Sequence, residues 1–291
     1  MSAAATGFRD SALGPALDAA LSPAGRAALY DRLRRASGLP SPRVNHGLVS
    51  AFAVEAARRG PAIDALLAAM CAIDEESAPY GHVDEIFPIL GVAGTGARAV
   101  ADPKARKKLV EALEDMACDR RSRVRGGVSV ALINVGLVDP KFSDTLVRWI
   151  EDDQPWLLRS VAVALLDTGF VGALGPETAA DLTDRMLIRI DREHRAGRRH
   201  EAFRRAVTAV NEALPVLVQR HPTAVLEVLI KHTKSLDEDV TDAIAATAAL
   251  LHKQRVADLA STLQEAIAAA TKPSRDPRWD RLPGKRGRSK R

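Results

Sequence analysis

The sequence predicts an all-α protein built from stacked helix pairs, and an internal repeat and the composition both support this. The segment Val128–Gly136 (VSVALINVG) recurs 33 residues later as Val161–Gly169 (VAVALLDTG), with Val, Val, Ala, Leu and Gly at matching positions. The same offset aligns Glu111–Asp119 with Asp144–Asp152. A period of this length, with two helix-length apolar patterns in each unit, is typical of helical-repeat arrays, in which each pair buries its face on the next.

The composition also favours helices. Apolar residues make up 46 % of the chain and aromatic residues only 4 %. Much of the apolar content is alanine, the best helix former, and few β-branched alternations occur. The net charge of +5 is unevenly placed, because residues 272–291 hold nine Lys or Arg against two Asp, which is +7 and leaves −2 for the rest. The basic balance is therefore a property of the C-terminal segment.

Helix starts and stops divide the chain into elements. Pro follows Ser, Asp or Gln at several expected starts, as at Ser22-Pro23, and Gly stands at several expected ends, as at Gly60. Within the expected helix over 83–100, Pro88 predicts a kink and three nearby glycines predict loose packing. The expected helices run near 10–20, 23–37, 43–59, 61–73, 83–100, 103–118, 121–136, 140–152, 155–168, 176–195, 200–219, 222–234, 236–251 and 254–271.

The domain prediction is one helical array over residues 10–271, between two ends without stable structure. Residues 1–9 are expected to be a disordered start. Residues 272–291 combine three Pro and two Gly with the nine basic residues, and this composition predicts a disordered basic tail.

Several site classes are not expected. Cys71 and Cys118 lie in apolar helical contexts and predict buried, reduced thiols rather than a disulfide. The cysteines and histidines lack metal-site spacing, so neither a metal nor another cofactor is predicted. The start of the chain lacks a basic stretch followed by an apolar one, and no run of about 18 apolar residues occurs, so we expect a cytoplasmic protein without a membrane partner.

Three segments resemble parts of a widespread, uncharacterised group of bacterial HEAT-repeat proteins. They are His82–Val100, Cys118–Gly136 and Arg198–Val207, and their order and spacing fit that group over roughly Leu66 to Arg255. The group has Cys-Gly where this chain has Leu90-Gly91, and Arg-Trp-Arg where it has Arg121-Ser122-Arg123. The resemblance implies a HEAT-like α-solenoid and says almost nothing about function.

A more distant resemblance is to the HEAT-like alkylpurine DNA glycosylases. Tyr80-Gly81-His82-Val83-Asp84 has the aromatic-x-x-x-Asp spacing of that family, with Tyr where the family has Trp, and an arginine-rich segment follows it. The resemblance implies that Asp84 would stabilise a cationic sugar and that Tyr80 would hold a cationic base. The simpler alternative is that Asp84 is an acid in the first turn of a helix, where it complements the helix dipole.

Arginine and tryptophan side chains form the other candidate site. Four arginines at one expected helix start oppose the helix dipole, which favours a use such as bidentate phosphate binding. The alternative is ion pairing between repeats with Glu114, Asp115 and Asp119. The tryptophans could stack on a base or anchor a partner, or could pack between repeats. The candidate binding residues are Arg120, Arg121, Arg123, Arg125, Arg148, Trp149, Trp156 and Arg159, with Lys285, Arg286, Arg288, Lys290 and Arg291 in the tail.

The sequence therefore predicts a non-catalytic HEAT-like binding or scaffold protein. Nucleic acid or another polyanion is one candidate partner, through the arginine-rich repeat starts and the tail. A protein bound on the concave face is another, and a DNA glycosylase is the enzymatic alternative. The concave face distinguishes the three alternatives. Tyr80 and Asp84 in one hollow with clustered arginines would favour the enzyme. A basic groove would favour nucleic acid, and an apolar or acidic groove would favour a protein partner.

Overall fold

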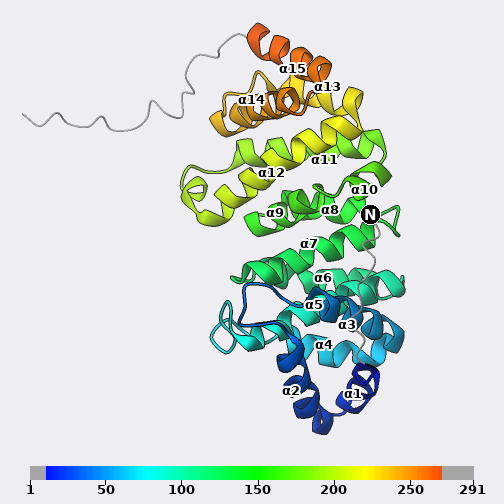
Figure 1. Ribbon diagram of the computed structural model, residues 1–291. Helices are drawn as coiled ribbons and strands as arrows, with labels where there is room; N and C mark the ends of the chain where they lie inside the picture. The colour runs from blue at the N-terminus through cyan, green and yellow to red at the C-terminus, as the bar shows by residue number, and fades with distance from the viewer. Residues whose placement is uncertain (1–10, 271–291) are drawn as a thin grey trace, which may run out of the picture. The chain divides into compact units, whose positions relative to one another are not determined.

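The computed structural model describes residues 11–270, which contain helices and no β-strand (Figure 1). The prediction of an all-α protein is confirmed. The expected disordered ends, 1–9 and 272–291, lie outside the described residues. The chain divides into two compact units between Ala173 and Leu174. The single array over 10–271 stays a prediction, and each unit is described by itself below.

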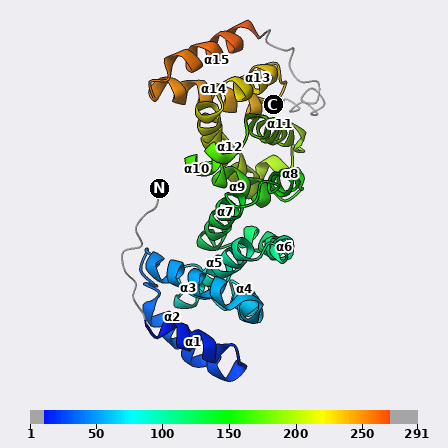
Figure 2. The same ribbon diagram turned by 90° about the vertical axis from the view of Figure 1, so that its right-hand side faces the viewer.

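The first unit is a two-layered stack. Helices α3, α5, α7 and α9 pack against one another in series, and α4, α6 and α8 pack along one side of that series (Figure 2). The unit consists of α1 (Leu13–Ala20), α2 (Arg26–Ala36), α3 (His46–Arg59), α4 (Asp64–Cys71), α5 (Ile86–Ala101), α6 (Arg106–Ala117), α7 (Ser122–Gly136), α8 (Ser143–Glu151), α9 (Pro155–Ala164) and α10 (Thr168–Ala173), with a short 3-10 turn over Val83–Glu85.

The 33-residue repeat corresponds to the pairs α6–α7 and α8–α9, and α7 packs against α9 as predicted. The repeat aligns three pairs of apolar residues, Val128 with Val161, Val130 with Val163 and Leu132 with Leu165, which predicts that they form its core. Val128, Leu132, Val161 and Leu165 are fully buried. Val163 is half-buried, and Val130 is 55 % exposed. A helix buries only one face, so residues two apart cannot all point into the core.

Helix α5 is the most enclosed helix of this unit, and its glycines explain why. An added Cβ would lie 2.7 Å from the Cys71 Sγ at Gly91, 2.5 Å from a Leu67 methyl at Gly94, and 2.6 Å from the Ala131 Cβ at Gly96. The expectation that these glycines loosen the helix was wrong, because they let α4 and α7 approach it closely. Pro88 lies in the first turn of α5, where its missing N–H costs no helical hydrogen bond.

The sequence prediction missed α10. The expected helix over 155–168 ends at Ala164, and a new turn begins where the Asp167 carboxylate accepts a hydrogen bond from the Phe170 N–H (2.8 Å). This is the pattern of a side-chain cap. Phe170 is buried against Gly136, where a side chain would collide with its ring. The glycine of the repeat therefore makes room for an aromatic ring of the next one.

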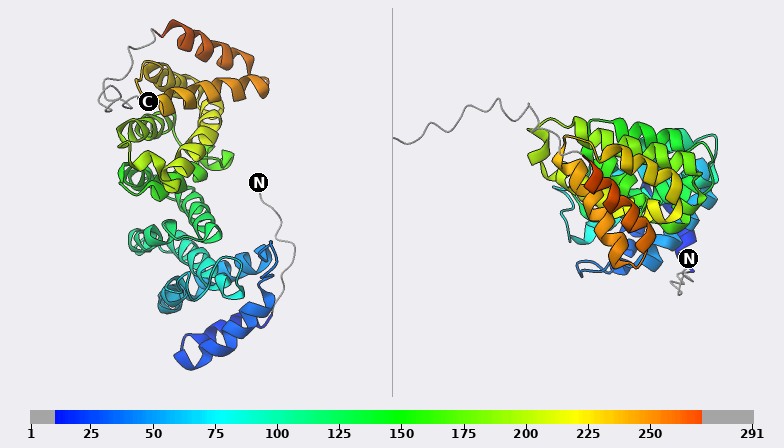
Figure 3. Two further views of the ribbon diagram at one scale, coloured as in Figure 1. Left: turned by 90° about the vertical axis from the view of Figure 1, so that its left-hand side faces the viewer. Right: turned by 90° about the horizontal axis from the view of Figure 1, so that it is seen from above.

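The described part of the second unit, residues 174–270, contains five α-helices. They are α11 (Pro176–Arg192), α12 (Glu201–Arg220), α13 (Pro222–His232), α14 (Glu238–Lys253) and α15 (Ala257–Ala269). Helix α11 packs on α13, α12 packs on α14, and α14 lies beside α15 (Figure 3). Arg198, between α11 and α12, links the end of α11 to the start of α14. Its guanidinium donates to the Ile190 carbonyl (2.8 Å) and pairs with Asp237 and Asp239 (2.5 Å each).

Candidate functional site

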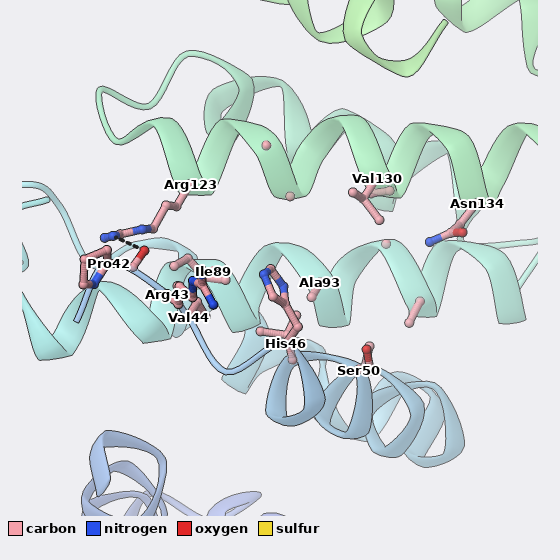
Figure 4. Close-up of a pocket in the computed structure, with 17 residues that line it drawn as sticks. Pro42, Arg43, Val44, His46, Ser50, Ile89, Ala93, Arg123, Val130 and Asn134 are labelled. Atoms are coloured by element: carbon pink, nitrogen blue, oxygen red, sulfur yellow. Dashed lines mark hydrogen bonds between the residues drawn. The ribbon is translucent and has the colours of Figure 1, made fainter. Parts of the chain in front are cut away.

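A groove of about 630 Å³ lies between α3, α5 and α7 of the first unit. Figure 4 shows Arg123, Pro42 and Arg43 at one end of it and Val130 and Asn134 toward the other. Most of the lining is apolar or small, and none of the lining residues is acidic. The lining comprises Pro42, Arg43, Val44, His46, Val49, Ser50, Ala53, Ile89, Ala93, Gly96, Ala97, Arg123, Gly126, Gly127, Val130, Ala131 and Asn134.

Small residues on α5 and α7 keep the groove open. A Cβ added to Gly126 would meet no atom within 4 Å, so the fold does not need glycine at this position. Gly127 is tighter, since its Cβ would lie 3.1 Å from a Val92 methyl. Glycine inside a helix costs about 1 kcal/mol relative to alanine. Gly126 therefore lowers the stability of α7, although no packing contact requires glycine there. Its missing side chain widens the groove.

The charge of the groove is concentrated at one end. Within residues 11–270, the Arg43 guanidinium and the His46 ring make no hydrogen bond or ion pair. Both side chains are exposed, and His46 begins α3 directly after Asn45, whose side chain caps the helix by accepting from the Leu48 N–H (3.1 Å). The cap fixes the start of α3 and so places His46 at the groove.

Arg123 is also at this end but is held by the protein. It donates to the Pro42 carbonyl (3.1 Å; Figure 4). It also donates to the Glu85 carboxylate (2.6 Å) and stacks over the Tyr80 ring at 4.4 Å. Glu85 is fully buried and also accepts from the Gly81 N–H (2.7 Å), whereas its second oxygen has no partner. Arg123 thus ties α7 to the loop before α5 and to the loop before α3.

The pair suggested by the glycosylase resemblance does not line the groove. Asp84 accepts from the Arg34 guanidinium (Nε–Oδ1 2.5 Å), and it lies in the 3-10 turn before α5. Tyr80 is 58 % exposed and faces Arg123. Asp84 is thus ion-paired with Arg34 just before the start of α5.

The arginines at the start of α7 mostly bind the protein itself. Arg121 is buried and donates to the carbonyls of Ile73 (2.8 Å) and Ala78 (3.0 Å), in addition to its ion pair with Asp119 (2.6 Å). It therefore fastens the loop that follows α4. Arg120 is largely exposed and lies 3.6 Å from a Glu75 oxygen. Asp119 is one of the acids that the packing alternative names, but it lies in the same repeat as Arg121, so this ion pair does not join two repeats.

The two tryptophans differ in how far they are buried. Trp149 is fully buried, and its indole donates to Glu114 (3.2 Å), which also accepts from Arg148 (2.5 Å). Trp149 therefore packs between helices and is not free to stack on a base. Trp156 is half-buried, and the guanidinium of Arg125 lies 3.9 Å from its ring centre.

The guanidinium of Arg159, which lies on α9 like Trp156, is 5.9 Å from the centre of the same ring. The structure thus brings Arg125, Trp156 and Arg159 together, whereas Arg120 lies near Glu75 and Arg148 pairs with Glu114. The tail candidates Lys285, Arg286, Arg288, Lys290 and Arg291 lie outside the described residues.

Sequence reasoning missed the groove and its polar ends. Arg43 and His46 stood in no motif, and Gly126 and Asn134 were noted only as part of the repeat helix. Two features of the sequence pointed to the groove. One is a Gly-Gly pair inside a helical pattern. The other is Val130, which cannot lie on the same buried helix face as Val128 and Leu132. Each is weak alone, because neither tells which helices meet there.

Comparison of the chain with protein-family models, with curated proteins and with solved structures gives no match. Among the described residues, no three His, Cys, Asp or Glu side chains gather in a way that could hold a metal ion. None of the described helices is long and apolar enough to cross a membrane.

Proposed function

We propose that the protein is a non-catalytic binding protein of the HEAT-like solenoid type, and that the α3–α5–α7 groove takes a segment of a partner protein. The observation that carries the proposal is the lining of the groove, which is small and apolar along its length and contains no carboxylate. Apolar surface with a few polar groups at its edge is the usual anatomy of a protein-recognition site.

The HEAT-like part of the proposal rests on the repeat. Two helix pairs, α6–α7 and α8–α9, follow each other at a 33-residue spacing, and their second helices, α7 and α9, pack side by side. The segments that resemble the bacterial HEAT-repeat group include α5 and α7, which line the groove.

The groove supports a protein partner better than a nucleic acid. A nucleic-acid groove needs cations along its length and aromatic platforms for bases. This groove has cations at one end, no Phe, Tyr or Trp in its lining, and an arginine, Arg123, that is already paired with Glu85. The glycosylase alternative is also less favoured, because Asp84 is paired with Arg34 and is not part of the lining.

The experiment compares Gly126→Leu with Gly172→Leu in the full-length protein. Both glycines are helical and have open space around the Cβ position, but only Gly126 lines the groove. Peptides selected from a random displayed library on the wild-type protein would be titrated against the three proteins. We expect binding to Gly172→Leu to be unchanged and binding to Gly126→Leu to weaken at least about tenfold, which is about 1.4 kcal/mol.

Equal binding to all three proteins would place the peptides outside the groove and contradict the proposal. Single-stranded DNA or RNA that bound the wild-type protein and lost binding only in Gly126→Leu would instead assign the groove to nucleic acid. Circular dichroism of both variants is the control for folding.

A further inference from the structure

We infer that the segment bound in the groove is an amphipathic α-helix of about three turns whose acidic end lies against Arg43 and His46. This inference rests on the proposed function, because it names the chemistry of the partner at the same site. It is argued from the architecture of the groove, its length and its charge.

The architecture favours a helix over the other peptide-binding modes. An extended peptide is usually bound by adding a strand to an exposed sheet edge, and residues 11–270 contain no sheet. A polyproline segment needs a groove lined with aromatic rings, and no Phe, Tyr or Trp lines this one. An amphipathic helix laid into an apolar groove is the mode that the lining of this groove, between α3, α5 and α7, fits best.

Length and side-chain size fit a helix as well. The lining residues of α7 extend from Arg123 to Asn134, a span of about 16 Å at 1.5 Å per residue, or three helical turns. Ala93, Gly96 and Gly126 present little side-chain bulk to this space. Small residues on a helix surface allow a second helix to approach to the short end of the usual 8–10 Å axis separation.

The charge of the groove favours a partner helix with an acidic end. Arg43 and His46 make no ion pair with any described residue, and the lining contains no carboxylate to neutralise them. Charges across an interface are arranged to be complementary, so a partner carries its carboxylates at this end. The basic segment 272–291 of this chain, with nine Lys or Arg against two Asp, has the wrong sign to be that partner.

The test uses a displayed library of helix-forming peptides about 14 residues long, enough to cover three turns with ends. Each peptide carries a randomised apolar stripe, and its terminal positions are randomised among Glu, Gln and Lys. The library is selected in parallel on the wild-type full-length protein, on Arg43→Glu and on Gly126→Leu. Arg43 makes no side-chain contact that the fold depends on, so its charge reversal should leave folding intact.

We expect Glu to be enriched at one end of the peptides selected on the wild-type protein. Synthetic peptides with that end should bind Arg43→Glu at least about tenfold more weakly. Selection on Arg43→Glu should enrich Lys at the same end. Both effects should be absent from Gly126→Leu, in which the groove is filled.

The outcomes separate the two proposals. Groove-dependent peptides without a charge preference, or with Lys preferred by the wild-type protein, would overturn the acidic helix and leave the proposed function standing. Peptides that bind Gly126→Leu as well as the wild-type protein would overturn both. A concentration-dependent dimer that Gly126→Leu abolishes would show that a second copy of the chain fills the groove, which also overturns the inference.

Discussion

The guanidinium of Arg123 lies 2.6 Å from the carboxylate of Glu85, and the side chain of Glu85 is fully buried. This ion pair holds the end of the groove in place, because Arg123 also bonds the Pro42 carbonyl and stacks on Tyr80. Arg123, which the sequence suggests as a binding residue, therefore has a structural role at the end of the groove.

Removal of Arg123 should destabilise the first unit strongly. Arg123→Met leaves the buried Glu85 charge without a cationic partner, and such a change costs about 3–5 kcal/mol. The double variant Arg123→Met with Glu85→Gln removes the charge as well and should recover part of that loss. Chemical denaturation of the three proteins measures both effects. A single-variant loss below about 1 kcal/mol, the value of an exposed pair, would contradict this role.

Two glycine substitutions should have opposite effects on stability. Gly126→Ala should raise the free energy of unfolding by about 0.5–1 kcal/mol, because alanine is the better helix former and its methyl group meets no atom. Gly94→Ala should lower it by about 1–3 kcal/mol, because its Cβ would overlap Leu67 and crowd Phe52. Thermal unfolding of the pair reports the sign of each. A loss of stability in Gly126→Ala would show that the groove is closed in solution.

Asp84 should prove structural rather than catalytic. Asp84→Asn should lower stability by about 0.2–1 kcal/mol, the range for partly exposed ion pairs such as the one with Arg34. Incubation of the wild-type protein with alkylated DNA should release no methylated purine above a buffer control. Release by the wild-type protein that disappears in Asp84→Asn would restore the glycosylase alternative.

The basic C-terminal segment should carry any affinity for polyanions. Deletion of residues 272–291 changes the formal charge from +5 to −2, since the segment contributes +7. Non-specific DNA or RNA binding should weaken, and the slope of log affinity against log salt should flatten by about 0.7–0.9 for each phosphate that the truncated protein no longer binds. Unchanged affinity and slope would place the binding residues elsewhere, with Arg120 and the Arg125–Trp156–Arg159 cluster the next to mutate.

Cys71 should make stability fall at high pH. Burial raises the pKa of its thiol to about 11, against an ordinary value of 9.0. The folded protein thus holds this proton more tightly than the unfolded chain does, so the contribution is complete below pH 9 and is lost as the pH rises toward 11. The difference in stability between the wild-type protein and Cys71→Ala, measured from pH 8 to 11, should shrink over this window. A constant difference would mean that the thiol is as accessible as in the unfolded chain.

The sequence by itself determined the helical class and most helix positions. Alanine content, the 33-residue repeat and the proline and glycine punctuation are local signals, and a helix is a local structure whose hydrogen bonds close within four residues. The same signals placed α7 beside α9, because equal repeats bury equal faces. They failed at α10, where the side chain of Asp167 starts a new helix and a ring from the next segment fills the space at Gly136.

Only the tertiary structure decided the candidate site. Four arginines in six residues suggested one basic cluster, but their side chains go to different parts of the first unit: Arg123 pairs with Glu85, Arg125 lies over Trp156, and Arg121 donates to the Ile73 carbonyl. The groove itself joins Arg43, Ala93 and Gly126 from three separate elements. Side-chain charge can be read from a sequence, whereas the partner that neutralises it, and the space left beside a glycine, depend on which helices pack together.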